Sequence, residues 1–179
     1  MNRKSLHHYS ELNRYQFVTF RTQESVDQYV KKVYGNIELS VARKQMQIDS
    51  YCDESKQGCY LTGQIMTIMM EHIQALEPEY YELVAVSIMP NHVHILFAQK
   101  RELNIIMQKI KGATAFKINK ILNRKGAFWD KSYFDKAIRD EPHFQLIYDY
   151  IKNNAYKAKL SDADIRFYGI YSNENIVGA

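Results

Sequence analysis

The stretch ELVAVSIM at residues 82–89, followed by PN at 90–91 and HVHILFA at 92–98, decides the fold. Both arms are rich in β-forming residues, and Pro90-Asn91 between them is a turn signal. Two strands on either side of so short a turn pair as an antiparallel hairpin. We therefore build the rest of the predicted fold around this hairpin.

The residues before the hairpin predict a strand and helices. The alternating, β-rich pattern of residues 15–21 indicates a first strand. Residues 24–50 are polar and ambiguous, and we expect part helix and part loop there. Ile65, Ile68, Met69 and Ile73 recur at helical spacing, which predicts a helix of about 12 residues ending near Glu77-Pro78.

The residues after the hairpin predict a long helix, a loop, a short extended piece and a last helix. Apolar residues from Leu103 to Ile121 mark a basic amphipathic helix with Gly112 in its middle. Residues 133–139 favour an extended piece. Pro142 suits the first turn of a helix that runs to about Lys159. This order predicts an α+β fold, a two-layer sandwich of an antiparallel sheet with helices packed on it.

Length and composition bound the class of protein. The 179 residues argue for one domain, which we place at residues 1–160, followed by a peripheral polar tail at 161–179. The chain has no apolar run near the roughly 20 residues that span a bilayer and no signal-peptide pattern at its start. Cys52 and Cys59 are too few for a disulfide framework and indicate reduced thiols. We expect a cytoplasmic protein with no membrane partner.

Positive charge is concentrated in one part of the chain. Residues 99–160 hold 14 Lys or Arg against 6 Asp or Glu, a net charge of +8, while the remainder carries −4. Such a distribution favours a polyanion-binding face, although solvated helix faces explain charge counts equally well.

Aromatic residues within the basic segment favour nucleic acid over the solvated-face alternative. The sequence RKGAFWDKSYF at 124–134 interleaves cations with the only Trp and three other rings. Unpaired bases stack on such rings while Lys and Arg hold phosphates. Trp129 has an equal alternative as a core anchor of the loop. The residues that we expect to contact nucleic acid are Lys111, Lys117, Arg124, Lys125, Trp129, Tyr133 and Arg139.

Two histidines share one face of the second hairpin strand. His92 and His94 alternate with Val93, Ile95 and Phe97, so the imidazoles point one way and the apolar side chains the other. Two imidazoles in this arrangement can converge on one divalent cation. Taken alone, a His-x-His pair on a half-exposed strand is more often plain polar surface.

The last helix offers a tyrosine and a carboxamide beside its apolar stripe. Tyr150 lies about 100° from the centre of the stripe, and Asn154 shares its side one turn later. Tyr148 lies on the stripe and is the better core residue. From periodicity alone, a position at the edge of the core is the more common role for such a tyrosine. The stripe itself consists of Phe144, Ile147, Tyr148, Ile151 and Ala155.

These motifs together resemble the HUH single-tyrosine transposases, closest to the REP-associated tyrosine transposase branch of the IS200-like family. The resemblance keeps the family's order across residues 84–160, whereas residues 24–60 match poorly. The matching pieces are Met89-Pro90-Asn91-His92-Val93-His94, Lys111-Gly112, Phe128-Trp129, Tyr133-Phe134-Asp135, Ala137-Ile138-Arg139 and Tyr150-Ile151-Lys152-Asn153-Asn154. Pro-Asn-His-Val-His combined with a late Tyr-Ile is far more specific than either half.

The resemblance implies a ferredoxin-like (RRM-like) sheet with both histidines on its central strand. It implies His92 and His94 as ligands of Mg²⁺ or Mn²⁺, Asn154 as third ligand, and Tyr150 as nucleophile. The implied activity is nicking and strand transfer of hairpin-containing single-stranded DNA through a phosphotyrosine, by a monomer or homodimer. One departure is Ala155, where the family usually has Pro, which lets the helix continue.

Two other functions stay open at this point. The chain could be a domesticated, non-catalytic protein that binds single-stranded nucleic acid, although an aromatic RNP signature is missing from its strands. It could also be a small metalloprotein of another purpose, for which His-x-His alone gives weak support.

Overall fold

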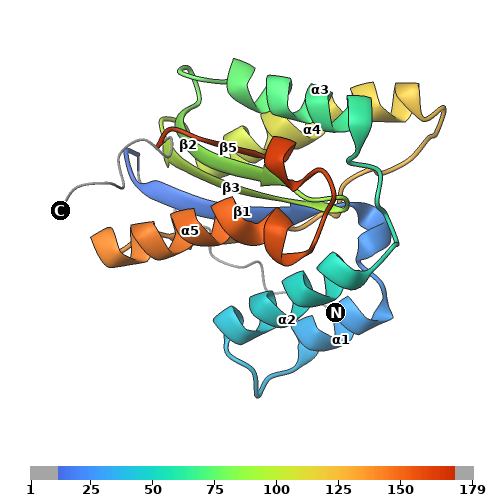
Figure 1. Cartoon of the computed structure of the whole chain (residues 1–179), viewed down its shortest axis with the longest axis horizontal. Coiled ribbons are helices and arrows are strands. Elements are labelled where there is room, and N and C mark those ends of the chain that lie inside the picture. The colour runs from blue at the N-terminus through green and yellow to red at the C-terminus, as the bar shows by residue number, and fades with distance from the viewer. Residues whose placement is uncertain (1–11, 172–179) are drawn as a thin grey trace.

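A five-stranded antiparallel sheet forms the centre of the protein (Figure 1). The structure is a computed structural model and describes residues 12–171. The strands lie in the order β4-β1-β3-β2-β5, so the histidine strand β3 is central, as expected. Their bounds are β1 Tyr15–Arg21, β2 Tyr81–Ile88, β3 His92–Gln99, β4 Phe134–Ala137 and β5 Phe167–Gly169.

The β2–β3 hairpin forms as its sequence predicts. Ile88 lies opposite Val93 in the register, and the amide of Met89 donates to the carbonyl of His92 at 2.9 Å. Pro90 and Asn91 make the turn between the two strands. The predicted strand bounds agree with the observed ones to within one residue.

Helices cover both faces of the sheet (Figure 1). α3 and α4 lie on one face and α5 on the other, with α1 and α2 paired near the end of α5. The order β4-β1-β3-β2 confirms the α+β, ferredoxin-like class, and α5 adds a further layer to the expected sandwich. The helix bounds are α1 Gln28–Gly35, α2 Val41–Glu54, α3 Gly63–Ala75, α4 Leu103–Ile121 and α5 Glu141–Lys157.

Strand alternation divides the core into two parts. On one face Val93, Ile95 and Phe97 pack among the buried side chains of α3 and α4. On the other face Leu96 packs with the stripe of α5, including Tyr148 and Ile151. Because β3 is buried on both faces, its polar side chains are buried as well. None of the helices in the described part of the chain has the length and apolar run that crossing a bilayer requires.

The residues at the ends of α5 explain where the helix begins and ends. The carboxylate of Asp140 caps it by accepting from the amide of His143 at 2.8 Å, and Pro142 occupies the first turn. The helix passes through Ala155 and ends at Lys157. The absence of a proline at position 155 therefore has the predicted effect.

The ambiguous segment becomes a helical hairpin of its own. Asp27 caps α1 and Ser40 caps α2, which explains why a polar stretch is helical. Its small core consists of Val30, Val33, Ile48 and Cys52. Both cysteines are free thiols, as expected.

The beginning of the expected tail differs from the prediction. β5 pairs with β2 at the edge of the sheet, and Arg166 before it is 2% exposed. Its guanidinium donates to the carbonyls of Leu61 and Ile88 at 3.0 and 2.7 Å and pairs with Asp162. These contacts pack residues 161–171 onto the domain, and residues 172–179 lie outside the described residues.

Candidate functional site

His92 and His94 lie side by side on the face of β3 that α5 covers. Both side chains are fully buried, and their ring centroids are 4.7 Å apart. The predicted alternation is confirmed, because Val93 and Ile95 pack on the opposite face.

One nitrogen of each imidazole is hydrogen-bonded and the other is not. His92 Nδ1 lies 2.8 Å from Asn91 Oδ1, and His94 Nδ1 lies 2.8 Å from Thr19 Oγ1. Both Nε2 atoms are buried and without a hydrogen-bond partner among residues 12–171. Buried polar atoms rarely lack partners, so two such atoms on adjacent side chains indicate a site built for a ligand.

Asp49 on α2 completes a group of three. One ligand atom from each of Asp49, His92 and His94 lies within 4.8 Å of the others. The Asp49 carboxylate also forms a buried ion pair with Arg21 of β1. Gln45, one turn earlier on α2, donates to the same carboxylate at 2.8 Å. The carboxylate is thus held by side chains of β1 and α2.

This group fits a divalent cation. Burial lowers the pKa of His94 to about 4 and that of His92 well below its ordinary value, so both rings are neutral near pH 7. Neutral imidazole is the form that binds metals. Two imidazole nitrogens and one carboxylate form a donor set that suits divalent transition metals.

Asp53, one turn after Asp49 on α2, borders the group. Its Oδ1 lies 3.6 Å from His92 Nε2. Burial, followed by the charge of Asp49, raises the pKa of this carboxyl to about 7. A second acidic side chain thus lies at the rim of the histidine pair.

Tyr150 reaches the same place from α5. Its ring centroid is 5.2 Å from that of His94, and its hydroxyl donates to Asp49 Oδ2 at 2.7 Å. Burial and then the charge of Asp49 raise the pKa of the phenol, so the resting hydroxyl is protonated. Tyr150 is half-buried, whereas Tyr148 on the stripe is fully buried, as the periodicity predicts.

Asn154 lies one turn after Tyr150 and is 3% exposed. Its amide nitrogen has no hydrogen-bond partner within the described part of the chain. Burial with an unpaired amide is compatible with a role at the site. Its role as a third metal ligand stays a prediction.

The residues expected to contact nucleic acid fall into two groups. Lys117, Lys125 and Arg139 are exposed. By contrast, Lys111 Nζ donates to the carbonyl of Asp130 at 2.7 Å, and burial lowers its pKa to about 8. The exposed group can meet phosphates directly, whereas Lys111 holds the aromatic loop.

Two aromatic-loop neighbours are engaged within the protein as well. Arg124 pairs with Glu24 at 2.9 Å, and its guanidinium lies 5.0 Å from the centre of the Tyr60 ring. The ring of Tyr133 lies 5.7 Å from Lys111 Nζ.

Of the two roles considered for Trp129, base stacking and anchoring of the loop, the structure favours anchoring. The ring is 5% exposed, stacks edge-on against Phe20 at 4.9 Å, and donates through Nε1 to Thr114 at 3.0 Å. A buried, hydrogen-bonded indole anchors the loop to the core. In this structure Trp129 therefore presents no face on which a base could stack.

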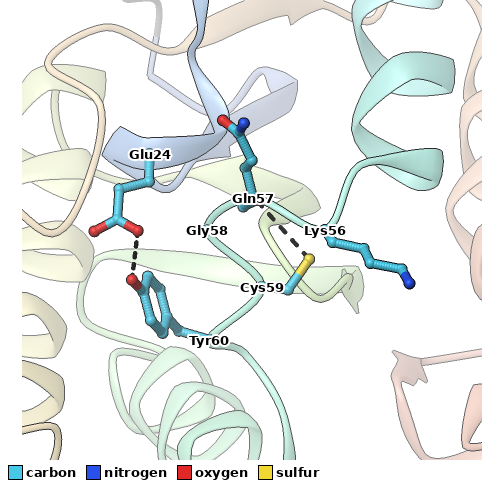
Figure 2. A pocket seen from close by; sticks show the side chains of 6 residues that line it. All are labelled: Glu24, Lys56, Gln57, Gly58, Cys59 and Tyr60. Carbon is cyan, nitrogen blue, oxygen red and sulfur yellow. Dashed lines mark hydrogen bonds between the residues drawn. The ribbon is translucent and has the colours of Figure 1, made fainter.

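A shallow hollow of about 410 Å³ lies on the loop that joins α2 to α3 (Figure 2). Glu24 and Tyr60 close one side, where the Tyr60 hydroxyl donates to the Glu24 carboxylate. Gln57 and Cys59 lie across from them, and Lys56 points away from the other side chains. The carbonyl of Gln57 also accepts from Asn91 at 3.2 Å, so this loop adjoins the histidine site.

Sequence reasoning missed Asp49. A usable signal existed, since Gln45, Asp49 and Asp53 recur every four residues along α2 and so share one face beside the apolar Ile48 and Cys52. Such a polar row next to a buried stripe marks side chains held at the edge of a core.

Comparisons with known proteins give one family match and similar solved structures. The family model described as "Transposase IS200 like" matches residues 53–154, more than half of the chain. Residues 12–52, which carry β1, α1 and Asp49, lie outside that match. No curated protein matches the chain.

Two solved structures are similar to the chain. The REP-associated tyrosine transposase bound to a REP hairpin superposes with a TM-score of 0.52 at 16% identity, covering 87% of this chain and 74% of that one. A candidate transposase of Deinococcus radiodurans R1 has a TM-score of 0.46 at 15% identity, covering 86% of this chain and 98% of that one.

Proposed function

The chain belongs to the family of IS200-like transposases, and on that basis we propose that it nicks and rejoins single-stranded DNA through a phosphotyrosine at Tyr150. One observation carries the proposal: the Tyr150 hydroxyl is hydrogen-bonded to Asp49, which lies in one cluster with His92 and His94. A nucleophile beside a cluster of metal-ligand type is what phosphodiester transfer requires.

A divalent ion, Mg²⁺ or Mn²⁺, would be held by the Nε2 atoms of His92 and His94 and a carboxylate oxygen of Asp49. The unpaired, buried Nε2 atoms support this assignment. Asn154 would add a further oxygen ligand. When bound, the ion would neutralise charge on the non-bridging phosphate oxygens.

Tyr150 supplies the attacking oxygen. As its Oη forms a bond to phosphorus, the bond from phosphorus to one strand oxygen breaks, and that strand end leaves. The phosphotyrosine conserves the ester bond, so a strand hydroxyl can later attack it and restore Tyr150. Asp49 Oδ2 already accepts the hydrogen bond of the phenol and is the atom placed to take its proton.

Exposed cations of the basic segment would hold the DNA. Lys117, Lys125 and Arg139 are free of burial and lie in the part of the chain with a net charge of +8. Phosphate contacts of this kind give affinity without reading sequence. One solved structure with this fold was captured with a hairpin, which supports hairpin-containing DNA as the substrate to test.

The test is adduct formation. The purified chain is incubated with end-labelled, hairpin-containing single-stranded DNA and Mn²⁺, and covalent complexes are resolved on a denaturing gel. We expect an adduct that EDTA prevents. DNA binding without any adduct would favour the non-catalytic alternative, and an adduct in EDTA would exclude the metal.

A further inference from the structure

The turn residue Asn91 joins three parts of the site. Its side chain is 1% exposed. The amide nitrogen donates to the carbonyls of Cys52 and Gln57 at 3.0 and 3.2 Å. Because carbonyl oxygens only accept hydrogen bonds, these two contacts fix which end of the amide is nitrogen. The oxygen is left facing His92 Nδ1 at 2.8 Å.

This arrangement determines the tautomer of His92. A carboxamide oxygen only accepts, so His92 Nδ1 must carry the hydrogen. In a neutral imidazole the other nitrogen then holds the lone pair. That nitrogen, Nε2, is the buried atom without a hydrogen-bond partner among the described residues.

His94 provides an internal contrast. Its Nδ1 contacts the hydroxyl of Thr19 at 2.8 Å, and a hydroxyl can donate as well as accept. Thr19 is therefore compatible with either tautomer of His94. Asn91 is compatible with only one tautomer of His92.

We propose that Asn91 is a positioning residue that locks His92 in its Nδ1–H tautomer and so directs the Nε2 lone pair to a divalent ion. The inference rests on the metal site of the proposed function. It goes further by assigning the control of ligand geometry to a buried residue that is not among the proposed metal ligands. Hydrogen-bond partners of metal-bound histidines commonly have this effect.

The same side chain couples the site to the rest of the molecule. Cys52 lies on α2, three residues after Asp49, and Gln57 lies on the loop that lines the hollow in Figure 2. One carboxamide thus ties the hairpin turn, the C-terminal part of α2 and the following loop together. A change in the loop would reach His92 through Asn91.

The first experiment reads the tautomer directly. Long-range ¹H–¹⁵N spectra of the metal-free protein, with ¹⁵N-labelled histidine, distinguish Nδ1–H from Nε2–H rings. We expect His92 to be Nδ1–H in the wild-type protein, assigned by loss of its signals in His92→Asn. An Nε2–H ring at His92 would overturn the proposal without any variant of Asn91.

The second experiment measures Mn²⁺ affinity by calorimetry. Asn91→Ala removes the acceptor, and we expect Kd to rise by about 10- to 100-fold with loss of the single His92 tautomer. Asn91→Asp keeps an acceptor for His92 Nδ1 but loses the two hydrogen bonds donated to Cys52 and Gln57, so His92 should stay Nδ1–H while the melting temperature falls. Asn36→Ala, at an exposed position that contributes no proposed ligand, is the control and should change none of these quantities.

The outcomes separate this inference from the proposed function. Folded Asn91→Ala protein with wild-type Kd and an unchanged His92 spectrum would overturn the inference, even if Tyr150 forms an adduct. Conversely, Asn91-dependent Mn²⁺ binding without any adduct would overturn the proposed activity and leave the inference standing. Failure of the wild-type protein to bind Mn²⁺ would overturn both.

Discussion

The hydroxyl of Tyr150 donates a hydrogen bond to Asp49 across 2.7 Å, although 101 positions separate the two residues in the chain. Tyr150 on α5 lies inside the residues that the family model matches, and Asp49 on α2 lies before their first residue. The site is therefore assembled from both parts, and each partner can be tested separately.

Replacing Tyr150 with Phe should abolish the covalent DNA adduct. The variant loses the only oxygen that can attack phosphorus from this side chain and keeps the ring that packs on Phe17 and His94. Folding and DNA affinity should stay near the wild-type values. Tyr156→Phe, on an exposed turn of the same helix, is the matched control and should keep full activity.

Tyr148→Phe separates the two candidate tyrosines. Its hydroxyl donates to the carbonyl of Tyr171 at 3.0 Å, so the variant should lose about 1 kcal/mol of unfolding free energy and keep adduct formation. An inactive Tyr148→Phe beside an active Tyr150→Phe would show that the roles on α5 are reversed.

Asp49→Asn should slow adduct formation by about 10²-fold or more, because it removes the proton acceptor of the phenol while keeping the shape of the side chain. The rate is measured in single turnover at saturating Mn²⁺. Recovery of the full rate under that condition would mean that Asp49 acts only as a metal ligand. Since Arg21 would lose its carboxylate partner, the melting temperature is recorded in parallel and should fall.

The stability of the metal-free protein should fall as the pH is lowered from about 7 to about 4. Burial lowers the pKa values of His92 and His94, so in this range the unfolded chain binds protons that the folded chain refuses. Above pH 6.5 both histidines are neutral in the folded and the unfolded state, and the free energy of unfolding is unaffected. Between pH 6.5 and pH 4 the unfolded state is protonated first, and the free energy of unfolding falls. Melting temperatures in EDTA check this, and His94→Asn should flatten the dependence.

Asp53 should oppose that trend. The pKa of its carboxyl is raised from the ordinary value of 3.8 to about 7 in the folded state. Between these two pH values the folded state keeps a proton on Asp53, whereas the unfolded state has lost it. Acid in this range therefore favours the folded state at this one group. Asp53→Asn should make the acid-induced loss of stability steeper, and a shallower dependence would contradict the assigned direction.

Measurements of DNA binding and of stability should distinguish the exposed lysines of the basic segment from Trp129. Lys117→Ala and Lys125→Ala should weaken single-stranded DNA binding without changing the melting temperature. Each lost phosphate contact should reduce the slope of log affinity against log salt by about 0.7. Trp129→Ala should instead cost about 3–5 kcal/mol of unfolding free energy, because it empties part of the core. Weaker binding by Trp129→Ala at unchanged melting temperature would restore its role as a stacking residue.

Local patterns predict the parts of the site that lie on single elements. Period-two alternation places His92 and His94 on one face of β3, and the helical stripe separates Tyr148 from Tyr150. The sequence could not pair Tyr150 with Asp49, because that contact depends on how α2 docks against α5. It could not decide between burial and exposure for Trp129, since an aromatic loop can fold inward or outward.

The layer formed by α5 was also beyond local patterns. A β-strand with alternating polar and apolar residues ordinarily exposes its polar face. Here the polar residues Thr19, Ser87, His92 and His94 are all buried, because α5 packs over that face and α2 brings Asp49 against the two histidines. The buried polar residues of the central strands therefore mark the position of the candidate site within the fold.

Through Arg166, the C-terminal segment at the edge of the sheet supports the turn that carries the proposed site. Its guanidinium holds the carbonyl of Ile88, two residues before Pro90, and the carbonyl of Leu61, whose amide is bonded to the carbonyl of Pro90 itself. A chain shortened at residue 160 would keep every proposed ligand and the nucleophile. It would nevertheless leave these two buried carbonyls without their donor, directly behind the turn that carries Asn91 and His92. If such a truncation lowers Mn²⁺ affinity, the cause would be loss of support for the turn, because every atom of the proposed site is still present.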